Sequence, residues 1–181
     1  MKLFKNLIDN LKNDVSFARK FLLGLSGAIF GIIITYTYYP QIPYRIGLID
    51  TPSVYKKIVI YKLEKPDDIK IKKNGMYVFK LPVETKYYPK GDLFIKYAKC
   101  LPGERLEVKG LKFYCNGTLI AIARKTDSKG VPVKHFEYNG TIPKGEYFMY
   151  APHPRSFDSR YWGFVPKKNF VGEVEWSLLN W

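Results

Sequence analysis

The segment 111–123 reads LKFYCNGTLIAIA, two apolar runs joined by the dipeptide Asn116-Gly117. Asn-Gly between two alternating apolar runs is a strong hairpin signal, because the tight turn needs two residues that tolerate positive φ. The sequence therefore predicts an antiparallel hairpin over residues 111–123.

Similar short apolar runs recur on both sides of this hairpin, bounded by Gly, Pro, Asn and Asp. With the two hairpin runs they cover residues 58–61, 76–81, 93–98, 105–108, 111–115, 119–123, 146–150 and 171–176. Short strands at this spacing, without long helical patterns between them, indicate an all-β barrel or sandwich. The high aromatic content of 17% favours the same class, since aromatic side chains fit a pleated, half-buried surface. The predicted fold class is mainly β.

The N-terminal region follows a different pattern. Residues 1–20 hold five basic and two acidic residues, whereas residues 21–39, FLLGLSGAIFGIIITYTYY, hold no charge. Nineteen helical residues approach the roughly 30 Å hydrocarbon core of a bilayer. Basic residues stay on the cytoplasmic side of such a segment, and tyrosines gather at the interface, here at its C-terminal end. The expected organisation is a cytoplasmic segment 1–20, a transmembrane anchor 21–39 and a periplasmic domain 40–181.

Two other interpretations of the segment 21–39 fit less well. A cleaved signal peptide has an apolar core of about 7–15 residues and a small-x-small exit, whereas this core is longer and runs into Tyr-Tyr-Pro. An ordinary buried helix of a soluble domain has a polar stripe, and this segment is apolar all round. The sequence favours an uncleaved anchor.

The formal net charge of +14 indicates an anionic partner, either nucleic acid or anionic lipid. The aromatic residues that a nucleic-acid platform needs are spread through the predicted strands, where a core requires them. The domain is also expected outside the cytoplasm. Membrane lipid is therefore the predicted partner, and nucleic acid is not.

The two cysteines, Cys100 and Cys115, lie in the part expected outside the cytoplasm. An oxidising compartment favours a disulfide, whose loop would contribute roughly 3 kcal/mol in the chain-entropy model. The alternative is a pair of buried free thiols that act as small hydrophobic side chains. Two histidines and two cysteines do not fall in metal-ligand spacing, so neither a metal site nor a cofactor is predicted.

The sequence offers few candidate catalytic residues, because neither His135 nor His153 has the sequence context of a catalytic triad. A lysine can replace histidine as the base if burial lowers its pKa from about 10.4 toward 7–8. Lys96 fits this condition, since both faces of the strand 93–98, LFIKYA, are otherwise apolar. The alternative is a structural lysine whose amine reaches out to solvent.

Three stretches of the sequence carry a family resemblance. The segment 91–104, GDLFIKYAKCLPGE, resembles the part of type I signal peptidases in which a catalytic lysine precedes a Leu-Pro-Gly-acidic turn. The segment 156–166, SFDSRYWGFVP, resembles the closing box of that family, and 73–79, KNGMYVF, resembles a further strand. The form HPRSFD at 153–158 is similar to the conjugal-transfer, TraF-type branch. The resemblance covers most of residues 40–181.

This resemblance implies a role for several side chains. Lys96 would be the general base for a serine nucleophile, and Ser156 would hydrogen-bond the lysine amine. Asp158 and Arg160 would pair and brace the loop, whereas without the resemblance they would be read as a surface turn with an exposed ion pair.

In the family the nucleophile lies between the anchor and the lysine, which leaves Ser53 in DTPSVY, residues 50–55. Ser26 lies inside the anchor and Ser128 follows Lys96, so neither matches the family order. The alternative for Ser53 is an ordinary turn serine.

The expected protein is a signal-peptidase-like β-barrel or sandwich catalytic domain behind a single N-terminal transmembrane helix in the bacterial inner membrane. The resemblance implies cleavage of an exported precursor with a signal peptide, and the branch suggests a pilin-like precursor. Release of the acyl-enzyme by water or by the substrate's own amino group, which gives a cyclic product, stays open. The alternative function is a non-catalytic, membrane-anchored assembly protein of a secretion or conjugation apparatus.

Overall fold

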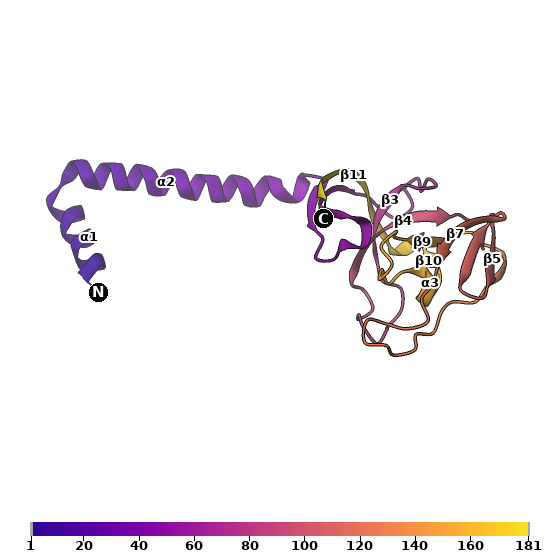
Figure 1. The fold of residues 1–181 in the computed structure, drawn as a ribbon. Coiled ribbons are helices and arrows are strands. Elements are labelled where there is room, and N and C mark those ends of the chain that lie inside the picture. The colour runs from indigo at the N-terminus through magenta and orange to yellow at the C-terminus, as the bar shows by residue number, and fades with distance from the viewer. Residues whose placement is uncertain (1, 181) are drawn as a thin grey trace. The chain divides into compact units, whose positions relative to one another are not determined.

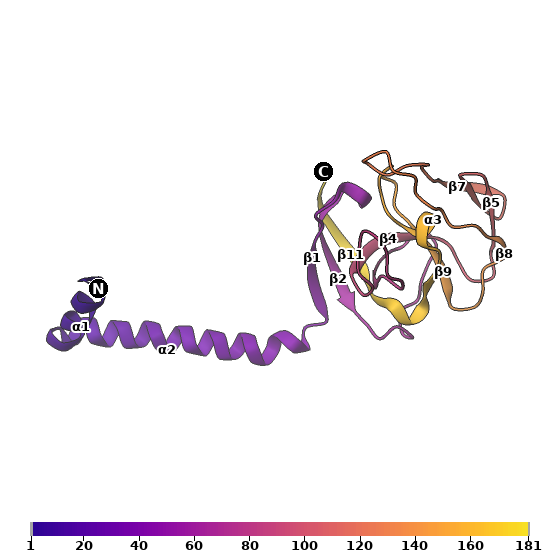
Figure 2. The same cartoon turned by 90° about the horizontal axis from the view of Figure 1, so that it is seen from below.

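The computed structural model describes residues 2–180 and divides into two compact units, Met1–Pro43 and Tyr44–Trp181. Figures 1 and 2 show a helical N-terminal unit and a β-rich C-terminal unit. The prediction of a mainly β fold behind one N-terminal apolar helix is confirmed.

The N-terminal unit consists of α1 (Lys2–Asn13), α2 (Val15–Tyr38) and the 3-10 turn η1 (Tyr39–Gln41). Asp14 caps α2, since its carboxylate accepts a hydrogen bond from the Phe17 amide at 3.0 Å. The stretch Val15–Gln41 is long and apolar enough to cross a membrane, with a mean hydropathy of 1.7. The hydroxyls of Thr35 and Thr37 donate to carbonyls one turn earlier, so these groups are satisfied within the helix.

The larger of two sheets in the C-terminal unit has seven antiparallel strands in the order β1-β2-β11-β3-β4-β9-β10. The edge strand β1 pairs with β2, and β2 pairs on its other side with β11 (Figure 2). These strands are β1 (Tyr44–Leu48), β2 (Lys56–Leu63), β3 (Met76–Lys80), β4 (Leu93–Cys100), β9 (Glu146–Tyr150), β10 (Val165–Pro166) and β11 (Phe170–Asn180).

The smaller sheet has four antiparallel strands in the order β7-β6-β5-β8. It contains β5 (Arg105–Lys109), β6 (Lys112–Cys115), β7 (Thr118–Ile122) and β8 (Asn139–Thr141). Asn116 and Gly117 form the turn between β6 and β7, with φ of 49° and 80°. Two positive φ values are what a tight hairpin turn requires, so the hairpin prediction is confirmed.

Three strands that the sequence did not reveal complete the sheets: β1, β8 and β10. β8 and β10 have three and two residues, and β10 ends on Pro166, which an edge strand tolerates because proline donates no ladder hydrogen bond. A four-residue helix, α3 (Ser159–Trp162), and two further 3-10 turns, η2 (Pro52–Val54) and η3 (Lys167–Asn169), connect the strands.

The core lies between and within the two sheets. One cluster joins Cys100 and Phe148 of the larger sheet to Leu106 and Phe113 of the smaller sheet, all fully buried. A second cluster around Phe79 packs β3, β4 and β11 against α3. Both clusters hold β4 in place at the centre of the fold.

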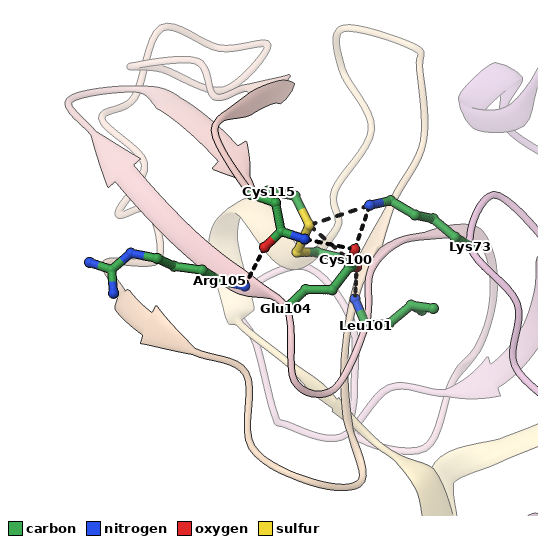
Figure 3. The surroundings of a disulfide bond; sticks show 7 residues. Lys73, Cys100, Leu101, Glu104, Arg105 and Cys115 are labelled. Atoms are coloured by element: carbon green, nitrogen blue, oxygen red, sulfur yellow. Dashed lines mark hydrogen bonds and ion pairs between the residues drawn. A yellow bond between two sulfur atoms is a disulfide. The ribbon is translucent and has the colours of Figure 1, made fainter.

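Cys100 and Cys115 form a disulfide with a Cα–Cα distance of 5.8 Å. It joins the end of β4 to the end of β6 and therefore links the two sheets (Figure 3). Glu104 lies beside the bond, where its carboxylate accepts hydrogen bonds from the Leu101 amide at 2.8 Å and from Lys73 Nζ at 2.6 Å. The two half-cystines are buried and belong to a hydrophobic core cluster, so the link lies in the core rather than at the surface.

Removal of this disulfide is expected to destabilise the folded state. The Cys100→Ala/Cys115→Ala double variant should lose about 2–5 kcal/mol of unfolding free energy, because the unfolded chain regains the freedom that the closed loop removes. Chemical unfolding of the membrane-extracted protein measures the change. A reductant should shift the midpoint of the wild type and leave that of the double variant in place. Equal midpoints for the two proteins would contradict the expectation.

Candidate active site

Lys96 lies on β4 with its side chain on the buried face of the strand. Its side chain is only 6% exposed, and its amine lies 5.3 Å from the centre of the Phe94 ring. On one side β4 pairs with β3, where Lys96 lies opposite Tyr77. On the other side the pairing with β9 begins only at Tyr97, so Leu93 to Lys96 have no strand partner there among the described residues. The lysine thus lies where β4 becomes a free edge.

Ser53 lies in η2, a single 3-10 turn that Pro52 begins with its fixed φ. Tyr55 ends the turn in the left-handed region at φ 56°, which is an uncommon conformation for a bulky residue and costs about 1 kcal/mol or more. The surrounding structure holds this turn, because the amide of His153 donates to the Ser53 carbonyl at 3.2 Å. The Tyr55 and His153 rings also pack edge to face.

These two segments bring Ser53 and Lys96 together although they lie 43 positions apart in the chain. The Nζ atom of Lys96 lies 3.1 Å from Oγ of Ser53, within hydrogen-bond distance. The hydroxyl of Thr51 donates to the same Oγ at 3.2 Å. Sequence reasoning missed Thr51, and the signal that could have found it is a second hydroxyl two residues before the candidate nucleophile.

The environment of Lys96 favours its neutral form. Burial lowers the pKa of Lys96 from 10.5 to about 8, while the charges of Asp158 and Arg160 act on it in opposite directions. A neutral amine can accept a proton, whereas an ammonium group cannot. Near pH 8, about half of the molecules therefore carry a lysine able to act as a base.

Asp158 and Arg160 form a buried ion pair next to this site. Arg160 Nε donates to Oδ1 of Asp158 at 2.7 Å, and Nη2 donates to Oδ2 at 2.8 Å. Two further guanidinium N–H groups donate to the carbonyls of Ile122 on β7 and of Ser156. The interpretation as a surface turn with an exposed ion pair is wrong, because the side chains of Asp158 and Arg160 are 0% and 2% exposed.

Ser156 does not form the expected hydrogen bond with the Lys96 amine. Its Oγ is buried and has no hydrogen-bond partner among residues 2–180. The physical reason is that Ser156 is held through its backbone, since its carbonyl accepts from Arg160 and its amide donates to the His153 carbonyl. The lysine amine is meanwhile directed at Ser53.

A cleft of about 580 Å³ opens over Ser53 and Lys96. Eight of its sixteen lining residues are polar or charged, and the other eight are apolar or aromatic. The cleft is lined by Leu48, Ile49, Asp50, Thr51, Pro52, Ser53, Tyr88, Asp92, Leu93, Phe94, Ile95, Lys96, His153, Arg155, Ser156 and Phe157.

One group of potential metal ligands lies elsewhere in the fold. The donor atoms of Cys100, Glu104 and Cys115 lie within 4.8 Å of one another. Because the two sulfur atoms are joined in a disulfide, they offer no thiolate to a metal ion. The proximity of Glu104 is explained by its hydrogen bonds to the turn that follows β4.

The sequence of this chain matches the family described as signal peptidase, peptidase S26, over residues 22–179. The chain therefore belongs to the S26 family of signal peptidases. The resemblance to type I signal peptidases is confirmed, and a TraF protein is among the relatives.

Individual relatives match shorter stretches. Signal peptidase I of Buchnera aphidicola is 64% identical over 34 residues, 18% of this chain and 11% of that protein. The conjugal transfer protein TraF of Agrobacterium fabrum is 31% identical over 80 residues, 43% of this chain and 44% of that protein. The chain thus spans less than half of the length of these two relatives. A crystal structure of a signal peptidase I from Enterococcus faecalis is 26% identical, with a TM-score of 0.40, and covers 58% of this chain and 97% of that one.

Proposed function

We propose that this chain is a membrane-anchored signal peptidase that cuts an exported precursor with Ser53 as nucleophile and Lys96 as general base. The observation that carries the proposal is the 3.1 Å separation of Ser53 Oγ and Lys96 Nζ inside a cleft. A serine and a lysine in this arrangement are a recognised alternative to the Ser-His-Asp triad. Membership of the S26 family supports the same chemistry.

The reaction would proceed through two acyl transfers. Neutral Lys96 takes the proton of Ser53 as Oγ attacks the scissile carbonyl, and the C–N bond then breaks as the lysine returns that proton to the leaving amine. The acyl-enzyme is released when water, or the substrate's own amino group, attacks the ester. Water gives a linear product, and an amino group of the same chain gives a cyclic one.

Thr51 would stabilise the negative charge that develops on the carbonyl oxygen. Its hydroxyl already donates to Ser53 Oγ, so it lies close to the point where the tetrahedral intermediate forms. Thr51→Val keeps the shape of the side chain but removes the donor, and should lower kcat by about 10²-fold. Thr51→Ser keeps the donor and should retain most of the activity. Equal kcat values for Thr51→Val and Thr51→Ser would exclude this role.

The substrate would bind in extended form along the free edge of β4. Leu93 to Lys96 offer unpaired backbone groups on the side that faces away from β3, and main-chain hydrogen bonds to a further strand give affinity. Alternate side chains of such a strand would point toward the cleft, and we expect small residues at those positions from the family resemblance.

The membrane location supports access to the substrate. We infer a cytoplasmic segment 1–20, an anchor centred on residues 21–39 and a periplasmic domain 40–181 in the inner membrane. Ser53 follows Tyr39 by only 14 positions, so the nucleophile would lie near the membrane surface where a precursor emerges. The excess of basic residues favours anionic lipid headgroups as a further partner.

The substrate would be a pilin-like precursor. The form HPRSFD at 153–158 and the TraF relative support the conjugal-transfer branch. The fold leaves both routes of release open, because the cleft lies at the surface and admits either water or a chain end.

Cleavage should depend on pH through the protonation of Lys96. The base must be neutral, so kcat/KM should rise with pH, reach half of its maximum near the pKa of about 8 and level off above it. At pH 6 the rate should be about 100-fold below the plateau, because only about 1% of the amine is neutral. Initial rates on one peptide from pH 6 to 10 test this. A rate that falls between pH 7 and 9 would contradict it.

Co-expression with a candidate pilin precursor tests the proposed function. Wild type should convert the precursor, and Ser53→Ala at equal membrane level should not, with products identified by mass spectrometry. A loss of 18 mass units relative to the linear product would identify cyclisation, since ring closure omits one water. Conversion by Ser53→Ala at the wild-type rate would instead favour the non-catalytic assembly role.

A further inference from the structure

A second cavity, of about 280 Å³, adjoins the candidate active-site cleft. The two hollows share four wall residues: Tyr88, Arg155, Ser156 and Phe157. A chain bound across Ser53 can therefore extend from one hollow into the other. None of the roles proposed above accounts for this second cavity.

The walls of the second cavity are held in place by aromatic contacts. The Phe157 ring stacks on Tyr161 at 5.5 Å between centroids and on Tyr88 at 5.9 Å. It also packs edge to face against Tyr87 at 5.3 Å. A rigid wall of this kind is a preformed surface, so little entropy is lost when a ligand binds against it.

The acidic residue of this cavity has hydrogen-bond partners, whereas its two arginines form no ion pair among the described residues. Arg124 and Arg155 are exposed, and neither guanidinium forms an ion pair with any residue of the described chain. Asp127, the acidic residue of the wall, accepts hydrogen bonds from the amides of Lys129 and Val131 and from the Tyr87 hydroxyl. Two arginines thus remain available for a ligand, and a guanidinium matches the geometry of a carboxylate.

Ser156 adds a polar group at the boundary between the hollows. Ser156 is only 3% exposed and is a wall residue of both hollows, and its buried Oγ lacks a hydrogen-bond partner among residues 2–180. A buried hydroxyl without a hydrogen bond costs free energy, and rotation of the Ser156 side chain toward the cavity would let a passing peptide group satisfy it. The boundary is therefore suited to a polypeptide backbone.

The apolar walls of the first cleft indicate which part of the substrate lies on each side. Leu48, Ile49 and Ile95 suit the apolar part of the substrate that forms the acyl-enzyme. We propose that the second cavity binds an acidic side chain on the leaving-group side of the scissile bond, through Arg124 and Arg155. This inference rests on the proposed peptidase function and adds a substrate preference to it.

Charge-varied peptides test the preference with the full-length protein in detergent. Each peptide carries alanine at two alternate positions before the scissile bond. Glu, Gln or Lys is placed in turn at each of the five positions after the bond and at the other three of the five positions before it. Wild type should cut the Glu peptide about tenfold faster in kcat/KM than the Lys peptide at one or two positions after the bond, the effect of one charge-assisted hydrogen bond. The difference should lie in KM.

Charge reversal provides the matched control. Arg155→Glu and Arg124→Glu should reduce or reverse the ratio of Glu to Lys cleavage, which is measured within each variant and so is independent of its overall rate. Lys144→Glu changes an exposed charge outside both cavities and should keep the wild-type ratio.

Three outcomes would overturn the proposal. Equal cleavage of Glu and Lys peptides by wild type would contradict the preference while leaving the peptidase function intact. A preference confined to positions before the bond would place the acidic residue on the wrong side. No cleavage of any peptide would contradict the proposed function itself, on which the preference rests.

Discussion

Replacement of Lys96 by alanine is expected to lower kcat for precursor cleavage by about 10⁴-fold or more, because the base that activates the nucleophile is lost. Lys96→Arg should be as inactive as Lys96→Ala. A guanidinium keeps the positive charge, but it does not lose its proton at accessible pH and cannot act as a base. The pair of variants therefore separates a catalytic amine from a structural charge, and a single-turnover assay with excess enzyme measures both.

Lys80→Ala is the matched control for these variants, since Lys80 lies on the neighbouring strand β3 with an exposed side chain. It should cut the precursor at the wild-type rate. Cleavage by Lys96→Arg at a rate close to that of wild type would mean that Lys96 contributes only its charge. Another base would then have to act on the nucleophile.

Loss of either member of the buried pair Asp158 and Arg160 is expected to have the largest effect on stability. Asp158→Asn or Arg160→Met should each lower the unfolding free energy by about 3–5 kcal/mol, since each leaves the partner charge buried without its counter-charge. The double variant should lose less than the sum of the two single losses. Denaturant unfolding, followed by tryptophan fluorescence, measures all three values.

The exposed pair of Arg105 and Glu107 is the control for this experiment, with Nε and Oε1 at 2.9 Å. Glu107→Gln should leave the unfolding free energy nearly unchanged, because solvent screens this pair. Additive losses for Asp158→Asn and Arg160→Met in the double variant would contradict a coupled pair. The positive charge of Arg160 also opposes protonation of Lys96, so the pair affects the site as well as the fold.

The sequence revealed eight strands because local pattern indicates them. The apolar run of β4, and the Asn116-Gly117 turn between the apolar runs of β6 and β7, need no reference to the rest of the chain. The strands β8 and β10, of three and two residues, are too short for a pattern, and the five-residue β1 forms by pairing with β2. Whether such a segment forms a strand depends on the strands that pair with it in the folded protein, and a single sequence does not reveal that pairing.

Some features of the candidate site also follow from local sequence pattern, and others depend on the tertiary structure. The apolar surroundings of Lys96 in its own strand indicated a buried amine, and the burial and lowered pKa agree with that local pattern. The resemblance to signal peptidases, rather than any local pattern, pointed to Ser53. The unpaired hydroxyl of Ser156 and the contact from Thr51 depend on how loops meet in space, which no periodicity predicts.

Covalent labelling tests the central claim most directly. A serine-reactive peptide fluorophosphonate, followed by proteolysis and mass spectrometry, identifies the residue whose hydroxyl is activated. We expect one adduct, on Ser53, that forms faster as pH rises through about 8 and is absent from Lys96→Ala. An adduct on Ser128 or Ser156, or labelling of Ser53 at an unchanged rate in Lys96→Ala, would contradict the assignment of Ser53 and Lys96 as the catalytic pair.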